Sequence, residues 1–361
     1  MNPTQRLHEL GQSLWLDNIT RTLLDEGTLA RYISVYSVTG LTSNPTIFDE
    51  AIGAGDAYDL GIREKVARGL AGEPLFIELA LEDLRRAGEL FQEVHETSGG
   101  VDGWVSMEVS PLLADDTRGT IEAAAAIHRQ ANCPNLFVKI PGTPAGIPAI
   151  EESIFNGVPI NVTLLFSREQ YLAAAEAYLR GIERRIAAGR SPGVASVASL
   201  FVSRWDRAVA GKVPAELRNR LGIAVARRTY RAYRELLDSP RWHGLAGAWR
   251  QRLLWASTSV KDPDASPTLY VEALAAPDTI NTIPDKTLRA FAEGGRLDGV
   301  MDPGGGDCEE VLAAFTDAGI DIDALATKLQ RDGAAAFVKS WQDLLACIGK
   351  KGQALGGGAR A

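Results

Sequence analysis

Short apolar segments alternate with longer amphipathic segments from about Leu14 to Arg289. The short segments are rich in β-branched and aromatic residues, which is typical of buried parallel strands. The longer segments carry leucine, alanine and aromatic residues on one helical face. Four of these predicted helices are Phe76–His95, Arg118–Gln130, Arg168–Ala188 and Ala224–Leu237. The pattern predicts eight strands: Leu14–Ile19, Val35–Thr42, Trp104–Val109, Leu136–Ile140, Pro159–Leu164, Val194–Phe201, Leu253–Thr258 and Thr279–Ile283.

Eight successive strand-then-helix units favour an α/β fold of the closed (β/α)₈ TIM barrel type, because an open doubly wound sheet more often uses about six strands. Two further helical patterns, Glu309–Ala318 and Ile322–Ile348, exceed what a minimal barrel requires. We expect these additional C-terminal helices to pack over the barrel. The absence of repeats and of internal linkers predicts a single barrel domain over residues 1–350, followed by a disordered tail at residues 351–361.

The composition of the chain argues against nucleic acid and membranes as partners. The chain has 361 residues, 45% of them hydrophobic, and a formal net charge of −8. It has no basic stripe for nucleic acid, no apolar run long enough to cross a membrane and no secretory leader, so we expect a cytoplasmic protein with neither partner. Cys133, Cys308 and Cys347 are scattered and lack a CxxC spacing, which predicts reduced thiols and no structural zinc site.

Polar residues occur where the predicted strands end, which is the position of catalytic groups in barrels of this type. A barrel with a purely structural role has no use for so many polar residues at this end. They are Asp17, Asn44, Glu108, Lys139, Asn161, Thr163, Ser199 and Ser257.

Lys139 is the most informative of these residues. It lies between Val138 and Ile140 in a predicted buried strand, so it must lose its charge or find a partner. An uncharged, desolvated amine is a nucleophile able to form a Schiff base with a carbonyl. The alternative is a structural pair with a carboxylate such as Asp17 or Glu108. The polar residues on the neighbouring strands favour catalysis.

Two carboxylates on nearby strands suit the proton transfers of such chemistry. Asp17 and Glu108 fall on the first and third predicted strands and can point into the same mouth as Lys139. One can serve dehydration of a carbinolamine and the other can take a proton from a sugar hydroxyl. The four histidines all lie away from the strand ends: His8, His95, His128 and His243. We therefore expect neither a metal nor a cofactor.

A phosphate site is predicted after the sixth and seventh strands. Barrels often bind a substrate phosphate there through loop amides, hydroxyls and a nearby cation. The stretch after the seventh strand offers Ser257, Thr258, Ser259 and Lys261. Arg204, just past the sixth strand, can add a bidentate grip on the same anion.

These motifs together resemble the transaldolase family from Leu14 to about Ile348. The matching stretches, in order, are Trp-Leu-Asp-Asn at Asp17, Thr-Ser-Asn-Pro-Thr at Asn44 and Phe-Val-Lys-Ile-Pro at Lys139. Asn-Val-Thr-Leu-Leu-Phe-Ser, from Asn161 to Ser167, is the most specific. The resemblance implies transfer of a dihydroxyacetone unit from fructose 6-phosphate or sedoheptulose 7-phosphate to erythrose 4-phosphate or glyceraldehyde 3-phosphate, the transaldolase step of the pentose phosphate pathway.

The resemblance also implies individual roles. Lys139 attacks the ketose carbonyl, and Asp17 takes the C4 hydroxyl proton. Glu108 and Thr163 hold the water that transfers protons, and Arg204 binds the phosphate. The three-carbon fragment is hydrogen-bonded by Asn44, Asn161 and Ser199.

Three alternatives stay open. Fructose 6-phosphate aldolases share the lysine strand, but they are shorter and typically have Gln where Glu108 stands and Tyr where Phe201 stands. Another Schiff-base aldolase and a catalytically inactive sugar phosphate binder are also possible. Many transaldolases place an arginine after the seventh strand, where this chain has Ser-Thr-Ser-Val-Lys, so the second phosphate contact is open. The sequence allows a monomer or a homodimer.

Overall fold

Eight parallel strands form the centre of the molecule. The structure is a computed structural model that describes residues 2–356. The strands are β1 (Gln12–Asp17), β2 (Val38–Thr42), β3 (Val105–Glu108), β4 (Leu136–Pro141), β5 (Ile160–Leu165), β6 (Ser196–Phe201), β7 (Gln251–Ala256) and β8 (Thr279–Ile283).

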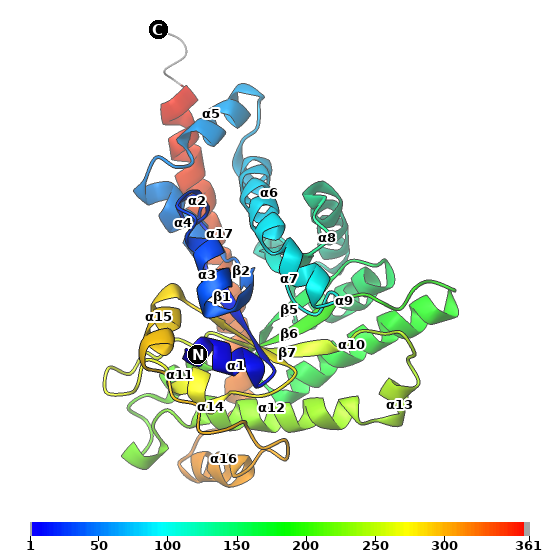
Figure 1. Ribbon diagram of the computed structural model, residues 1–361, viewed down its shortest axis with the longest axis vertical. Coiled ribbons are helices and arrows are strands. Elements are labelled where there is room, and N and C mark those ends of the chain that lie inside the picture. Colours follow the sequence, from blue (N-terminus) through cyan, green and yellow to red (C-terminus); the bar gives the residue numbers. More distant parts are fainter. Residues whose placement is uncertain (1, 357–361) are drawn as a thin grey trace.

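Helices fill the connections and cover the outside of the sheet (Figure 1). They are α1 (Pro3–Glu9), α2 (Arg21–Asp25), α3 (Thr28–Tyr36), α4 (Pro45–Ala54), α5 (Asp59–Ala67), α6 (Gly72–Leu90), α7 (Gln92–Thr97), α8 (Thr117–Ala131), α9 (Gly146–Phe155), α10 (Arg168–Ala187), α11 (Ser203–Val209), α12 (Leu221–Leu237), α13 (Pro240–His243), α14 (Leu269–Ala273), α15 (Asp285–Gly294), α16 (Cys308–Asp317) and α17 (Ile322–Gly356). Two short 3₁₀ turns are η1 (Pro111–Leu113) and η2 (Ala215–Leu217).

The sheet curls into a nearly closed barrel. Its strand order is β2-β1-β8-β7-β6-β5-β4-β3, and every pair is parallel. The two edge strands meet through a single bridge between Gly40 and Trp104. The (β/α)₈ TIM barrel predicted from the sequence is confirmed.

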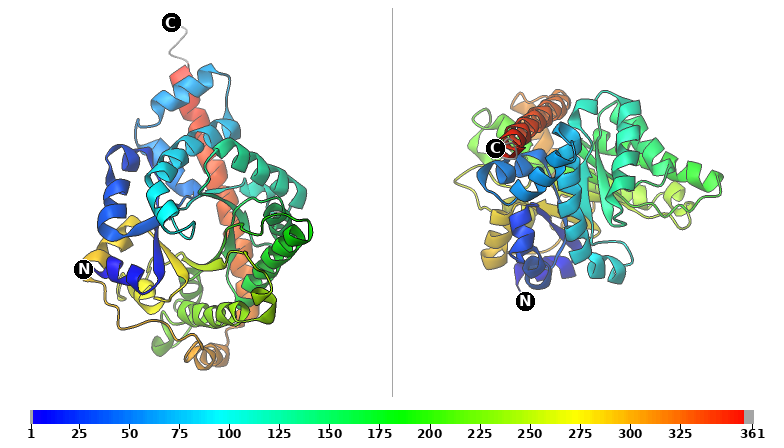
Figure 2. Two further views of the ribbon diagram at one scale, coloured as in Figure 1. Left: turned by 45° about the vertical axis from the view of Figure 1, so that its right-hand side comes forward. Right: turned by 90° about the horizontal axis from the view of Figure 1, so that it is seen from above.

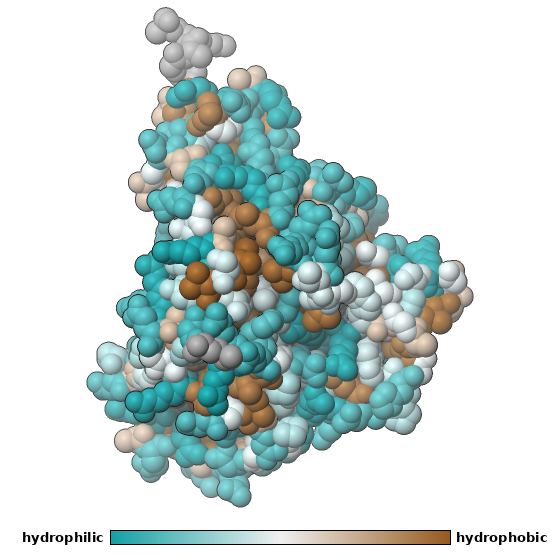
Figure 3. Space-filling view, viewed as in Figure 1, coloured by the Kyte–Doolittle hydropathy of each residue, from teal (hydrophilic) through white to brown (hydrophobic). Residues whose placement is uncertain are grey.

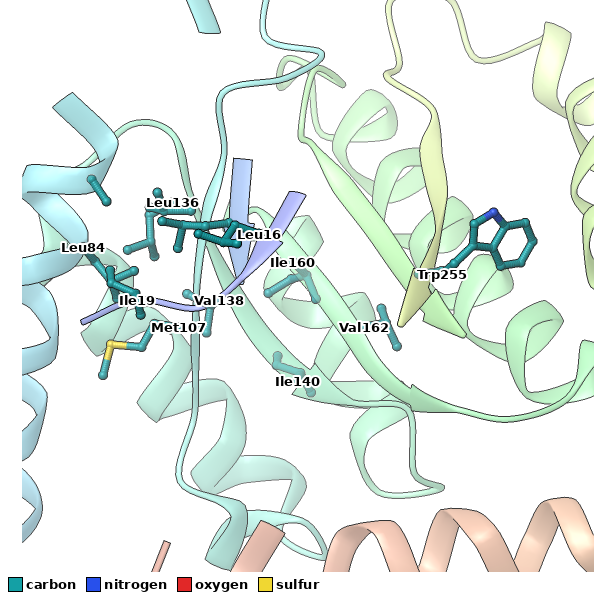
Figure 4. Close-up of a cluster of buried hydrophobic side chains, with 14 of the residues drawn as sticks. Leu16, Ile19, Leu84, Met107, Leu136, Val138, Ile140, Ile160, Val162 and Trp255 are labelled. Atoms are coloured by element: carbon teal, nitrogen blue, oxygen red, sulfur yellow. The ribbon is translucent and has the colours of Figure 1, made fainter. Parts of the chain in front are cut away.

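The alternation of side chains along β4 shows why its lysine faces inward. Leu136, Val138 and Ile140 lie in the cluster between the barrel and its helices, with Ile160 and Val162 of β5 (Figure 4). The residues between them must point to the opposite face of the sheet. Phe137 does so, because it stacks on Trp104 inside the barrel with ring centroids 4.1 Å apart. Lys139 follows on the same face.

A buried ion pair closes the N-terminal end of the barrel, opposite the strand ends predicted to be catalytic. Arg252 Nη1 donates to Asp102 Oδ1 at 3.1 Å, and Nη2 donates to Ser13 Oγ at 2.6 Å. Asp102 also accepts from Trp15 Nε1 at 3.3 Å. Arg252 and Asp102 are both buried, so the pair is shielded from solvent.

Replacing Arg252 by leucine is expected to lower the free energy of unfolding by about 3 kcal/mol, because Asp102 is left as an unpaired buried charge. Urea denaturation measures this loss. Arg250→Leu is the matched control: Arg250 pairs with Asp278 at 2.9 Å near the surface, so its loss is expected to cost under about 1 kcal/mol. Equal destabilisation by both variants would contradict the conclusion that the buried pair of Arg252 and Asp102 stabilises the barrel more than the surface pair of Arg250 and Asp278.

The two C-terminal helices take different positions. α16 packs on the outside of the barrel against α12, where Arg231 of α12 pairs with Glu309 at 2.5 Å. α17 crosses the barrel opening on its far side in the left view of Figure 2. It continues to Gly356, whereas the sequence pattern placed a tail from residue 351; that boundary was wrong. The remaining predicted tail, residues 357–361, lies outside the described residues.

The face shown in Figure 3 is mostly hydrophilic, with hydrophobic side chains gathered in a few patches. No helix within residues 2–356 combines the length and the apolar character that a bilayer crossing needs.

Candidate active site

A cavity of about 690 Å³ opens at the C-terminal ends of the strands. It is lined by side chains from the barrel and by α17, which contributes Ala336, Phe337 and Ser340. The structure places eleven of the twelve residues predicted for the site in its lining, and the twelfth, Glu108, contacts Lys139 directly. The eleven are Asp17, Asn44, Lys139, Asn161, Thr163, Ser199, Phe201, Arg204, Ser257, Ser259 and Lys261.

Strand register brings the central polar groups together. Glu108 of β3 is paired in register with Lys139 of β4, which is paired with Asn161 of β5. The three side chains therefore form one layer across neighbouring strands. Thr163 lies one layer nearer the mouth, in register with Pro141.

Lys139 is held by one charged and one neutral acceptor. Its Nζ donates to Glu108 Oε1 at 2.9 Å and to the carbonyl oxygen of Ser43 at 2.7 Å. Only 7% of each residue, Lys139 and Glu108, is exposed. Ser43 Oγ lies 2.9 Å from Glu108 Oε2 and can donate to it. Lys139 therefore has a carboxylate partner for its charge and still lines the cavity.

Asp17 lies at the end of β1 and lines the same cavity. Its Oδ1 accepts from Thr42 Oγ1 at 3.0 Å and, at 3.5 Å, from Asn44 Nδ2. Burial raises the pKa of Asp17 above its ordinary value of 3.8, although the positive charge of Lys139 and these two hydrogen bonds oppose the shift. The carboxyl group of Asp17 therefore holds a proton more readily than an exposed aspartate, and its carboxylate is the stronger base.

The local sequence fixes Asn44 at the start of a helix. Asn44 is the N-cap of α4, and its Oδ1 accepts from the backbone N–H of Ile47 at 3.1 Å. Pro45 occupies the first helical turn, where its missing N–H costs nothing. The amide nitrogen of Asn44 is left facing Asp17 and the cavity.

Asn161 and Ser199 form a second polar group on the cavity floor. Ser199 Oγ donates to Asn161 Oδ1 at 2.7 Å, and Asn161 Nδ2 donates to Ser106 Oγ at 3.3 Å. Just beyond Thr163, Leu164 has a φ of 59°, in the left-handed region, where β5 shifts its register against β6. This strained residue directly follows Thr163, at the cavity end of the strand.

Cations gather on the side of the cavity formed by β6 and β7. The guanidinium of Arg204 lies 5.0 Å from the ring centroid of Phe201. Desolvation lowers the pKa of Arg204, and the nearby positive charge of Arg207 adds to this effect. Arg204, Arg207 and Lys261 all line the cavity, and none of them forms an ion pair with an acidic side chain within residues 2–356.

Some of the site residues were not found by sequence reasoning. Ser43 holds both Lys139 and Glu108, and it lies inside the Thr-Ser-Asn-Pro-Thr motif, so its place in the motif was an available signal. Arg207 follows Arg204 by one helical turn, which is a second signal. Phe337 and Ser340 were missed because the expectation that the C-terminal helices pack over the barrel does not say which of their residues face the cavity.

A barrel whose mouth holds a buried lysine beside a carboxylate has the layout of the Schiff-base aldolase class. A family model described as Transaldolase/Fructose-6-phosphate aldolase matches residues 14–348. The chain belongs to this family.

Curated relatives from several bacteria carry the name Transaldolase. The protein of Parafrankia sp. (strain EAN1pec) is 42% identical over 96% of this chain and 97% of its own length. That of Thermobifida fusca is 43% identical over 95% of this chain and 96% of its own length. That of Neisseria meningitidis is 40% identical over 93% of this chain and 97% of its own length.

Proposed function

We propose that the protein acts as a transaldolase, moving a dihydroxyacetone unit from fructose 6-phosphate or sedoheptulose 7-phosphate to erythrose 4-phosphate or glyceraldehyde 3-phosphate in the pentose phosphate pathway. The observation that carries this proposal is the buried Lys139, paired with Glu108 and lining a cavity that also holds Asp17 and a group of cations.

The first half of the reaction forms the Schiff base. Lys139 Nζ, after giving its proton to Glu108, adds to the C2 carbonyl carbon of the ketose. Glu108 and Thr163, through a bound water, return a proton to the new hydroxyl, which leaves as water and gives an iminium. Glu108 suits this step because its carboxylate lies 2.9 Å from Nζ.

The second half breaks and remakes a carbon–carbon bond. Asp17 takes the C4 hydroxyl proton, the C3–C4 bond breaks, and its electrons pass into the iminium to form an enamine. The aldose phosphate leaves, while Asn44, Asn161 and Ser199 hold the three-carbon fragment. The enamine carbon then attacks the aldehyde of the acceptor, Asp17 returns its proton, and hydrolysis of the new iminium frees Lys139.

The phosphate of donor and acceptor is bound on the cationic side of the cavity. Arg204 supplies the forked guanidinium that matches a phosphate. Lys261 and the hydroxyls of Ser257 and Ser259 supply the contacts after β7, where the sequence left the second phosphate ligand open. All four residues line the same cavity, and Phe201 forms the surface on which Arg204 lies.

Product analysis with trapping tests the proposal. Borohydride reduction in the presence of fructose 6-phosphate is expected to add the mass of a reduced dihydroxyacetone adduct at Lys139. With erythrose 4-phosphate present, sedoheptulose 7-phosphate is expected to form. Accumulation of free dihydroxyacetone from fructose 6-phosphate alone would instead favour a fructose 6-phosphate aldolase, and absence of any adduct would argue against every Schiff-base function, leaving only a sugar phosphate binder.

We also propose a cytoplasmic location, which the three free thiols support because such cysteines are typical of a reducing compartment. The proposed assembly is a monomer or a homodimer.

A further inference from the structure

One face of α17 lies over the mouth of the barrel. Residues three, four and seven positions apart share a helix face, and Ala336, Phe337 and Ser340 follow Gly333 at this spacing. Ala336, Phe337 and Ser340 line the cavity. One turn before Gly333, Gln330 Nε2 donates to the carbonyl oxygens of Gly142, at 2.9 Å, and Leu164, at 3.0 Å. This face is therefore fastened to the ends of β4 and β5.

Gly333 lies against the cationic side of the cavity. A methyl group on Gly333 would lie 3.1 Å from Arg204 Nη1 and 3.0 Å from Leu164 Cδ2. Both distances are shorter than ordinary van der Waals contact, so a neighbour would have to move. Leu164 is buried and its backbone is bound to Gln330. The guanidinium lies at the end of a longer and more flexible side chain than the buried leucine, so we expect the guanidinium to move.

We propose that Gly333 is a positioning residue for Arg204: the space left by its missing side chain lets the guanidinium lie between α17 and the Phe201 ring, aimed at the substrate phosphate. The C-terminal helix thereby takes part in selecting phosphorylated sugars. This inference rests on the proposed function, in which Arg204 binds the phosphate.

On the side away from α17, the guanidinium of Arg204 lies against packed aromatic rings and has little room to move. The Phe201 ring supports the guanidinium at 5.0 Å, and Phe201 packs on Phe166 with ring centroids 5.3 Å apart. Phe166 Cε2 also lies 3.6 Å from the methyl position on Gly333. Arg204 is thus held between an aromatic pair and the helix backbone, and added bulk on the helix pushes the guanidinium out of this position.

The test is the first half-reaction, measured as borohydride-trapped adduct at Lys139 with fructose 6-phosphate and with unphosphorylated fructose. In Gly333→Ala the concentration of fructose 6-phosphate giving half-maximal trapping is expected to rise about tenfold, because a displaced guanidinium loses phosphate contact. The maximal rate and the trapping of fructose should stay within about twofold of wild type. An equal loss for both sugars would overturn the inference, because it indicates general damage to the site.

Gly349→Ala is the matched control, because it makes the same change in the same helix where no atom lies within 4 Å of the added methyl group. It should leave both sugars unaffected.

A double-mutant cycle supplies the second arm. Lysine has no Nη1, so Arg204→Lys weakens fructose 6-phosphate trapping by itself, and Gly333→Ala should add no further loss in that background. Additive losses would show that the two residues act independently and would overturn the inference, as would a wild-type result for Gly333→Ala. If wild type itself forms no adduct, the proposed function fails first.

Discussion

Replacing Lys139 by arginine is expected to reduce turnover of fructose 6-phosphate with erythrose 4-phosphate by at least about 10⁴-fold, because no other group can replace a nucleophile that forms the covalent intermediate. Arginine keeps a positive charge beside Glu108, whose Oε1 lies 2.9 Å from Nζ in the wild type. The buried carboxylate stays paired, and the variant is expected to fold. A coupled enzyme assay of the products measures turnover, and borohydride trapping measures formation of the covalent adduct.

Lys65→Arg is the matched control for this change. Lys65 is also a buried lysine paired with a carboxylate, Glu82, but it belongs to α5, away from the cavity. The same substitution there is expected to leave turnover within about twofold of wild type. Residual turnover of Lys139→Arg close to the wild-type rate, or an adduct on another lysine, would show that the nucleophile had been assigned wrongly.

Replacing Asp17 by asparagine is expected to lower kcat by about 10²–10⁴-fold, the usual contribution of a positioned general base. The amide can still accept from Thr42 and Asn44, so the geometry survives while the base is lost. Since the proposed role of Asp17 follows imine formation, borohydride is expected to trap the whole six-carbon donor on Lys139, whereas wild type yields the three-carbon fragment. Mass spectrometry of the peptide containing Lys139 distinguishes the two adducts.

The same variant is expected to be more stable than wild type at neutral pH. Burial raises the pKa of Asp17 above 3.8, so the fold favours the protonated form. Stability from this group is fully present below pH 3.8 and is lost as the pH rises through the folded-state pKa. Asparagine does not ionise, so the variant does not lose this stability as the pH rises. Thermal melting should show a higher Tm for Asp17→Asn at pH 7 and a difference that shrinks on acidification.

For the same reason, the acid limb of the wild-type kcat profile should lie above the pH at which an exposed aspartate titrates. Asp25→Asn, a change at an exposed carboxylate of α2 that pairs with Arg86, should alter neither kcat nor the adduct. A three-carbon adduct from Asp17→Asn would show that another group takes the C4 proton.

The barrel could be predicted because strand and helix periodicities repeat eight times, but the element boundaries depend on contacts that the pattern does not contain. Val35 and Tyr36 were assigned to the second strand, whereas they end α3, because Ser37 then takes a left-handed φ of 51° and stops the helix. β7 begins earlier than predicted, at Gln251. Arg252 fell outside the predicted strand, which began at Leu253, yet it is buried in β7 and paired with Asp102.

The candidate site could be predicted because polar residues stand out in apolar strands, and their C-terminal ends meet in any barrel. That reasoning reaches Lys139 and Asp17 directly. It cannot reach Phe337, because a helix expected to pack over the barrel does not reveal from its sequence which side chain enters the cavity. It also could not choose among the partners of Lys139, because Asp17 and Glu108 were equally available until the register of β3 and β4 was known.

The position of α17 in the chain has a consequence for protein synthesis. The ribosome makes the strands that carry Asp17, Glu108 and Lys139 well before it makes Phe337 and Ser340, which line the cavity from α17. On the nascent chain the mouth therefore stays uncovered until α17 has been made. Full shielding of a covalent intermediate from water must wait until this helix has left the exit tunnel and docked.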